Sequence, residues 1–208
     1  MRDLGPAQIE IAAQLLADGE VIAVPTDTVY GLGCRLDRPD SLRRLFEIKR
    51  RPADVALPVL VASLSMALEL VGPLSDRARA LMARWWPGPV TFVVPCEQEL
   101  ATLVGASTGS IGLRCPGDSL LLDLLGLSGP LAVTSANLHG SPPATSPEEV
   151  RSAFSSTPLV AAVLDGGPRQ QPPSSVIEIG PERLTVLRQG AVSVEVLEQF
   201  LESEGLED

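Results

Sequence analysis

The sequence predicts an α/β protein: a single domain over residues 1–208, built on a mixed β-sheet with flanking helices. Apolar runs typical of buried strands alternate with segments whose apolar residues recur at helical spacing. The two kinds of segment do not keep the regular strand–helix–strand order of a parallel sheet, which favours a mixed one. Hydrophobic residues make up 45% of the chain and aromatic residues 3%, so Leu, Val, Ala and Ile must build the core.

The individual elements follow from local patterns. Ile9, Ala12 and Leu16 lie on one helical stripe over residues 6–18, which Gly19 ends, and Ser146 begins a helix-capping signature. Residues 25–33 and 97–109 are expected to be loops because they are rich in small polar residues and glycine. Further helices are expected at about 41–48, 64–70, 76–85, 117–125 and 193–203, and strands at 21–24, 59–61, 90–94, 110–114, 131–134, 159–164, 175–179 and 184–187.

Composition and charge narrow the class of protein. The net charge is -10, so the broad basic face that binds nucleic-acid backbones is not expected. No apolar run reaches the ~18 residues of a membrane span, and the N-terminus lacks the layout of a signal peptide. Cys34, Cys96 and Cys115 are too far apart for a disulfide framework or a metal knuckle. These features predict a soluble, cytoplasmic protein with no membrane partner.

The positive charge is concentrated in one short segment. Five of the 16 basic residues fall within residues 43–51, and Lys49 is the only lysine of the chain. Such a local cluster favours a small anionic ligand. In an extended segment Lys49 and Arg51 would point the same way, and a point charge beside a planar guanidinium suits phosphate oxygens. A solvated basic helix end explains the same residues equally well.

Polar residues also gather where two predicted strands end. Ser135 and Asn137 follow the strand at 131–134, at a place where α/β sheets put ligand-binding loops. A side-chain turn that caps the strand is at least as well supported by the sequence. Residues 26–30, with Thr26, Asp27 and Thr28, leave the strand at 21–24 and suit a polar small molecule, although a tight turn explains them too.

Arg114 ends the apolar strand at 110–114. A charge that leaves a buried strand needs a partner, and the carboxylate of a ligand would serve. The run at 85–89 (WWPGP) predicts a helix end with aromatic packing rather than a platform on which bases stack.

Absent motifs narrow the chemistry further. The sole lysine is followed by Arg50, so there is no Walker A loop, and no G-x-G-x-x-G occurs. The only histidine, His139, is expected to be an ordinary loop residue, and no G-x-S-x-G elbow accompanies it. One histidine and three separated cysteines exclude a zinc site. The protein is therefore expected to work by positioning and electrostatics, without a covalent nucleophile or zinc.

Several of these segments together resemble the YrdC-like family of L-threonylcarbamoyladenylate synthases, over about residues 6–190. The matching motifs occur in the family's order: 25–33 (PTDTVYGLG), 49–52 (KRRP), 86–91 (WPGPVT), 111–116 (IGLRCP), 134–137 (TSAN), 174–178 (SSVIE) and 187–190 (LRQG). The family's K-x-R and S-x-N signatures fall on Lys49/Arg51 and Ser135/Asn137.

The resemblance implies a twisted sheet around a concave, positively charged cavity. It also implies a nucleotidyltransferase that joins L-threonine, bicarbonate and ATP, with Mg²⁺, into threonylcarbamoyl-AMP and pyrophosphate. The product would serve the modification of adenosine 37 in ANN-decoding tRNA through a downstream threonylcarbamoyl-transferase complex. A carbamate formed from threonine would be the nucleophile, which explains why the protein supplies none.

The resemblance also implies roles for single residues. The L-threonine site would comprise Thr28, Arg114, Ser135 and Ser174. The ATP site would comprise Lys49, Arg51, Ser110, Asn137, Thr145 and Arg188. Lys49, Arg51, Ser135 and Asn137 would be the catalytic group, with Arg114 on the amino-acid carboxylate and no protein metal ligand.

The chain departs from the family pattern in a few places. Val55 and Leu60 stand where the family often has Asn and His, and Gln189 replaces a proline. The resemblance predicts the short form, without the extra C-terminal domain of longer members. Two alternatives stay open: a relative of the same fold that makes another carbamoyl-adenylate, and an RNA-binding or ribosome-maturation module, which the net charge disfavours. The resemblance to the synthases also allows a weak tRNA contact.

Overall fold

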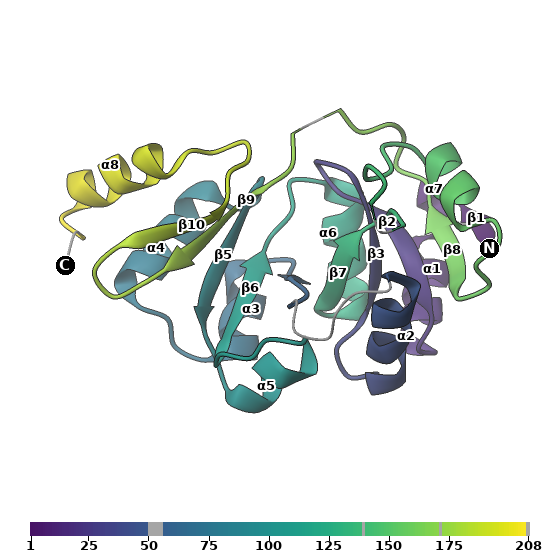
Figure 1. Cartoon of the computed structure of the whole chain (residues 1–208), viewed down its shortest axis with the longest axis horizontal. Helices are drawn as coiled ribbons and strands as arrows, with labels where there is room; N and C mark the ends of the chain where they lie inside the picture. Colours follow the sequence, from purple (N-terminus) through teal and green to yellow (C-terminus); the bar gives the residue numbers. More distant parts are fainter. Residues whose placement is uncertain (50–55, 139, 171, 207–208) are drawn as a thin grey trace.

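The structure, a computed structural model, describes residues 1–49, 56–138, 140–170 and 172–206. Within them the strands form one mixed sheet in the order β1-β8-β2-β3-β7-β4-β6-β5-β9-β10 (Figure 1). The pairs β1–β8, β2–β8, β4–β6 and β5–β9 are parallel and the other neighbours antiparallel. The predicted mixed α/β class is confirmed.

The strands are β1 (Arg2–Leu4), β2 (Val21–Pro25), β3 (Tyr30–Arg35), β4 (Val59–Leu60), β5 (Val90–Pro95), β6 (Ser110–Arg114), β7 (Leu131–Ser135), β8 (Val160–Leu164), β9 (Ser175–Ile179) and β10 (Leu184–Arg188). After a 3₁₀ turn at Pro6–Gln8, the helices are α1 (Ile9–Ala17), α2 (Pro39–Lys49), α3 (Leu64–Val71), α4 (Asp76–Trp85), α5 (Gln98–Leu103), α6 (Ser119–Ser128), α7 (Pro147–Phe154) and α8 (Val194–Glu204).

The core has two parts, one on each face of the sheet. Strand β2 is buried throughout, and its alternate residues divide between them: Val21 and Ala23 join the larger cluster, and Ile22 and Val24 the smaller. Helices α1 and α6 cover the smaller cluster. The segment between β8 and β9 crosses over the top of the molecule, and the two termini lie at opposite ends of its long axis (Figure 1).

The helix end predicted at residues 85–89 is confirmed. Helix α4 ends at Trp85, whose ring packs edge-on against Phe200 of α8 with 4.9 Å between ring centroids. The indole nitrogen of Trp86 donates to the carbonyl of Val90 at 3.0 Å. Both rings are thus used in packing, as the sequence indicated. The capping role of Ser146 is also confirmed, because its hydroxyl accepts from the Glu149 amide.

The prediction of a loop over all of residues 25–33 is wrong for its second half. Strand β3 starts at Tyr30 and carries two glycines that looked like turn residues. Gly31 is needed for close packing instead: a Cβ there would lie 2.5 Å from Cγ1 of Val133 on the adjacent strand. Residues 97–109 were likewise expected to be a loop and contain α5, and β1 was not predicted at all.

We expect Gly31→Ala to lower the free energy of unfolding by about 1–3 kcal/mol, because the added methyl group overpacks the β3–β7 contact. Gly126→Ala in α6 is the matched control. Nothing lies within 4 Å of the position that its added methyl group would take, so this change should stabilise the protein by about 0.4–1 kcal/mol. Urea unfolding of both variants measures the difference, and an equal effect of the two would contradict the packing argument.

Two buried thiols make the stability depend on alkaline pH. Burial raises the pKa of Cys34 to about 12, against a small opposing effect of Arg44, and burial with the Asp27 charge raises the pKa of Cys115 to about 11. The unfolded chain releases these protons near pH 9, so the folded state holds more protons above that pH. The contribution of the two thiols to the free energy of unfolding should therefore be constant below about pH 8 and fall from about pH 9 upward. Urea unfolding at a series of pH values measures it. Cys34→Ala should make the free energy of unfolding fall less steeply with pH. An unchanged dependence on pH would contradict a role for the Cys34 thiol.

Candidate active site

A cavity of about 800 Å³ opens on one face of the sheet. Alternate residues of three neighbouring strands line it, as expected where every second side chain points to the same face. These residues are Thr91 and Val93 of β5, Ser110, Gly112 and Arg114 of β6, and Val176 and Glu178 of β9. Its charged lining among the described residues is Arg114, Arg188 and Glu178. The cavity lining therefore combines apolar side chains with a few polar ones, and its described charged residues are two cations and one anion.

Arg114 is buried in the cavity wall and contacts three other residues of the chain. Its side chain keeps 7% of its accessible surface, and Nη2 lies 2.5 Å from Oδ1 of Asp27. Its Nε donates to the carbonyl of Gly88 at 3.0 Å, and Nη1 lies 3.4 Å from the hydroxyl of Thr28. The partner that the sequence demanded for this buried cation is thus present within the chain as Asp27. Burial lowers the pKa of Arg114, and the Asp27 charge opposes that shift.

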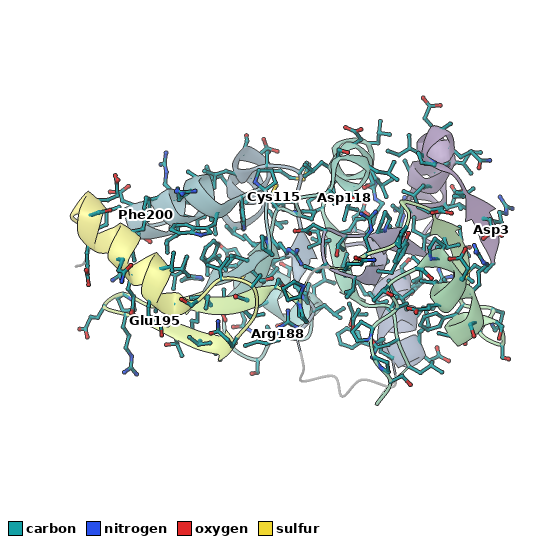
Figure 2. The ribbon with its side chains drawn as sticks, turned by 90° about the horizontal axis from the view of Figure 1, so that it is seen from above. Asp3, Cys115, Asp118, Arg188, Glu195 and Phe200 are labelled. Atoms are coloured by element: carbon teal, nitrogen blue, oxygen red, sulfur yellow. The ribbon has the colours of Figure 1, made fainter. Side chains whose placement is uncertain are left out.

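Ser174 and Arg188 form a second part of the wall. The guanidinium of Arg188 donates from Nε and Nη2 to the carbonyl of Ser174, and from Nη2 to its hydroxyl at 2.9 Å. The Ser174 hydroxyl also lies 3.4 Å from that of Thr91. Desolvation and the nearby charge of Arg114 both lower the pKa of Arg188. Seen from above, Arg188 lies toward the middle of the molecule, and Glu195 and Phe200 of α8 lie toward one end (Figure 2).

Lys49 is the last residue of α2, and it is buried with 7% exposure. The expectation that it belongs to an extended segment is therefore wrong, and so is the alternative of a solvated helix end. Its ammonium donates to the carbonyls of Ser135 and Asn137, at 2.8 and 2.6 Å, and to Oδ1 of Asn137 at 2.5 Å. The structure thus joins the two motifs that the sequence could only name separately.

The Asn137 side chain is oriented by three contacts. Its Oδ1 accepts from Lys49 and from the Ser135 hydroxyl, which lies at 2.7 Å, and its Nδ2 donates to the carbonyl of Ser141 at 2.5 Å. This arrangement is more than a turn that caps a strand, because it includes a cation from α2. Ser135 lines the cavity, so the Lys49–Ser135–Asn137 group lies at its edge.

Only some of the other predicted site residues line the cavity. Thr28 and Ser110 line the cavity, and the Ser110 hydroxyl lies 2.9 Å from that of Thr108. Thr145 is not among the described lining residues, and its hydroxyl donates to Glu149 at 3.0 Å. The basic cluster at 43–51 is split, because Arg43 pairs with Asp40 and Arg44 with Glu20. The predictions for Arg51, Val55 and His139 lie outside the described residues, as does Arg50.

Sequence reasoning missed several lining residues. Thr91, Thr108 and Glu178 line the cavity, and so does Leu60, which had been noted only as a departure from a family pattern. The alternation of β5 and β9 could have found two of them. Thr91 and Glu178 interrupt apolar strands at positions that share the face of Val93 and Val176.

The described residues provide no group of three or more His, Cys, Asp or Glu side chains that could hold a metal ion. Glu178 is the one carboxylate among the described lining residues. Mg²⁺ often keeps several waters and is bound through substrate phosphates with one or two carboxylates. The donor set therefore does not form a dedicated protein site for Mg²⁺, and a metal that enters together with a phosphate ligand fits it better. In the same part of the chain, no helix has the length and apolar character needed to cross a membrane.

A mixed sheet whose cavity presents two arginines and several hydroxyl groups suits a small anionic ligand. The sequence profile of the Sua5/YciO/YrdC family, described as "Telomere recombination", matches residues 14–190. The chain belongs to this family.

Curated relatives agree with the profile. The chain is 38% identical over 197 residues to a threonylcarbamoyl-AMP synthase of Bacillus subtilis, covering 93% of this chain and 56% of the relative. It is 36% identical over 184 residues to a putative threonylcarbamoyl-AMP synthase of Mycobacterium tuberculosis, covering 88% and 84%. The chain thus spans little more than half the length of the B. subtilis relative and most of the mycobacterial one.

Two solved structures have the same fold. Pyrococcus abyssi Sua5, in complex with L-threonine, superposes with a TM-score of 0.88 at 31% identity, covering 96% of this chain and 60% of Sua5. Escherichia coli YciO superposes with a TM-score of 0.83 at 26% identity, covering 93% and 97%. These superpositions cover nearly all of the single-domain α/β fold described above.

Proposed function

We propose that the protein is a threonylcarbamoyl-AMP synthase, which forms threonylcarbamoyl-AMP and pyrophosphate from L-threonine, bicarbonate and ATP. The observation that carries this proposal is the meeting of Arg114, Thr28 and Ser174 in one cavity, next to the Lys49–Ser135–Asn137 group. The names of the curated relatives, and the L-threonine in the Sua5 structure, support the same assignment.

The chemistry needs positioning more than protein nucleophiles. The amine of threonine attacks the carbon of bicarbonate and water leaves, which gives a carbamate. A carbamate oxygen then attacks the α-phosphorus of ATP, and the bond to the β-phosphate oxygen breaks to release pyrophosphate. Both steps bring anions together, so the protein has to hold them in line and offset their charge.

The described residues suit that task. Arg114 would hold the amino-acid carboxylate, with hydroxyls of Thr28, Ser135 and Ser174 around it. Arg188, Ser110 and Lys49 would contact the nucleotide, and Lys49 would offset charge on phosphate or carbamate. Arg51, Asn137 and Thr145 belong to the proposed nucleotide site through the family motif. Mg²⁺ would enter as part of the ATP substrate.

The cellular role follows from the product. Threonylcarbamoyl-AMP is an activated acyl donor, and we propose that a separate transferase complex passes its threonylcarbamoyl group to adenosine 37 of ANN-decoding tRNA. Weak tRNA contact by this protein, location in the cytoplasm and the extent of the domain over residues 1–208 are parts of the same proposal.

An omission assay tests the function. Purified protein is incubated with ATP, Mg²⁺, bicarbonate and L-threonine, each left out in turn, while pyrophosphate is followed. We expect release only in the complete mixture. Release without threonine, or with another amine in its place, would contradict the proposal and point to a different carbamoyl-adenylate.

A further inference from the structure

The two arginines in the cavity wall differ in how their charge is balanced. Arg114 forms an ion pair with Asp27 at 2.5 Å. Arg188 is held by the carbonyl and the hydroxyl of Ser174, which are neutral groups. No ion pair of Arg188 occurs within the residues that the structure describes. The cavity wall therefore presents one cation that is paired with a carboxylate and another that is held by neutral groups.

Asp27 stands behind Arg114 as seen from the cavity. Arg114 and Thr28 are lining residues, whereas Asp27 is not among the described ones and its side chain keeps 14% exposure. Its other oxygen, Oδ2, is confined by the backbone, because a Cβ on Gly117 would lie 3.3 Å from it. The carboxylate is thus held close to the guanidinium, outside the described lining of the cavity.

The hydrogen bonds leave one end of the guanidinium for a ligand. Nε and one hydrogen of Nη2 are taken up by Gly88 and Asp27. The contact of Nη1 with Thr28, at 3.4 Å, is long. An arginine carries five N–H donors, so Nη1 and the second hydrogen of Nη2 can meet a carboxylate in the cavity. Asp27 leaves Arg114 able to bind a ligand while cancelling most of its net charge.

We infer that Asp27 is a specificity-determining residue, which makes the part of the cavity at Arg114 select a zwitterionic amino acid and reject phosphate groups. The inference rests on the proposed function and adds to it. A zwitterion places its carboxylate on Arg114, and its ammonium group is attracted by Asp27. A pyrophosphate or triphosphate group carries several negative charges, so the Asp27 carboxylate disfavours its binding at Arg114.

Arg188, in contrast to Arg114, has no carboxylate partner among the described residues. Its charge is therefore available to a polyanion. The same cavity can therefore bind an amino acid at Arg114 and a polyphosphate at Arg188, and neither ligand takes the place of the other. Such sorting matters for this reaction because pyrophosphate is released beside the amino-acid site.

The test compares Asp27→Asn with the wild type by calorimetry, using L-threonine and pyrophosphate as probes. Asparagine keeps an acceptor for Nη2 and removes the charge. We expect Asp27→Asn to bind pyrophosphate about tenfold more tightly than the wild type. Pyrophosphate should then weaken threonine binding about tenfold in Asp27→Asn and less than about twofold in the wild type. Asp37→Asn, in the exposed pair with Arg35, is the matched control and should behave as the wild type.

Three outcomes would overturn the inference: equal competition by pyrophosphate in both proteins, unchanged pyrophosphate affinity, or the same change in Asp37→Asn. A merely structural role for Asp27 would lower the melting temperature without altering the choice between anions. If Asp27→Asn does not fold, competition in the wild type decides the matter. Saturating pyrophosphate should weaken threonine binding less than about twofold there, and displacement of threonine by pyrophosphate would refute the inference. Calorimetry measures pyrophosphate binding without turnover. A failed omission assay would therefore contradict the proposed function without deciding the role of Asp27.

Discussion

Lys49→Ala is expected to reduce pyrophosphate release from ATP, bicarbonate and L-threonine by about 10²–10³-fold while the protein stays folded. Lys49 is buried and donates to Ser135 and Asn137 at the cavity edge, so its charge acts in a poorly solvated place where screening is weak. Loss of this donor removes a preorganised cation from the proposed phosphate site, and it removes one of the three contacts that orient the Asn137 amide.

The change also removes the ammonium donor from three buried contacts, and the Asn137 carbonyl loses its hydrogen bond to Lys49, which should cost about 1–3 kcal/mol of unfolding free energy. Circular dichroism and urea unfolding measure this cost separately from turnover. Arg43→Ala is the matched control: it removes a cation from the same helix, but one whose side chain is 75% exposed. Near-normal turnover of Lys49→Ala, or an equal loss in Arg43→Ala, would contradict the assignment.

Arg114→Met is expected to have the second large effect. It removes the proposed carboxylate contact, so L-threonine affinity should fall about 100-fold, with a much smaller change for ATP. It also leaves the Asp27 carboxylate buried without its cation, and breaking such a pair costs about 3–5 kcal/mol. Calorimetric titration with each substrate and urea unfolding give the two quantities.

A second variant separates binding from stability. Arg114→Met/Asp27→Asn removes the stranded charge, so most of the lost stability should return while threonine affinity stays low. Arg35→Met, which breaks a more exposed pair, should cost less than about 1 kcal/mol and leave binding unchanged. Recovery of threonine binding in the double variant would show that Arg114 does not contact the amino acid.

Much of the fold could be predicted because the signals are local. Apolar spacing along one segment decides whether it can bury a strand or a helix, and most predicted elements agree with the structure to within a few residues. The failures have a tertiary cause. The glycines of β3 look like turn residues until Val133 of β7 lies against Gly31, and α5 is too short to show a clear helical period.

The candidate site was predicted in its parts but not in its assembly. The motifs around Lys49, Arg114 and Ser135 were visible as residue types at strand or helix ends, and the family resemblance assigned them roles. Their mutual contacts could not be foreseen. The sequence suggested that Lys49 belongs to an extended segment or to a solvated helix end. It is instead a buried helix residue, because its partners come from β7 and the loop that follows.

By itself, then, the sequence determined the mixed α/β class, the order of most elements and the residue types available for anion binding. These depend on composition and on periodicity within a single segment. Only the tertiary structure decided that Lys49 meets Asn137 across 88 positions of the chain, and that Asp27 balances Arg114 across 87. The physical reason is that a buried charge is stabilised by the groups that folding brings around it, and strand order, not sequence distance, selects those groups.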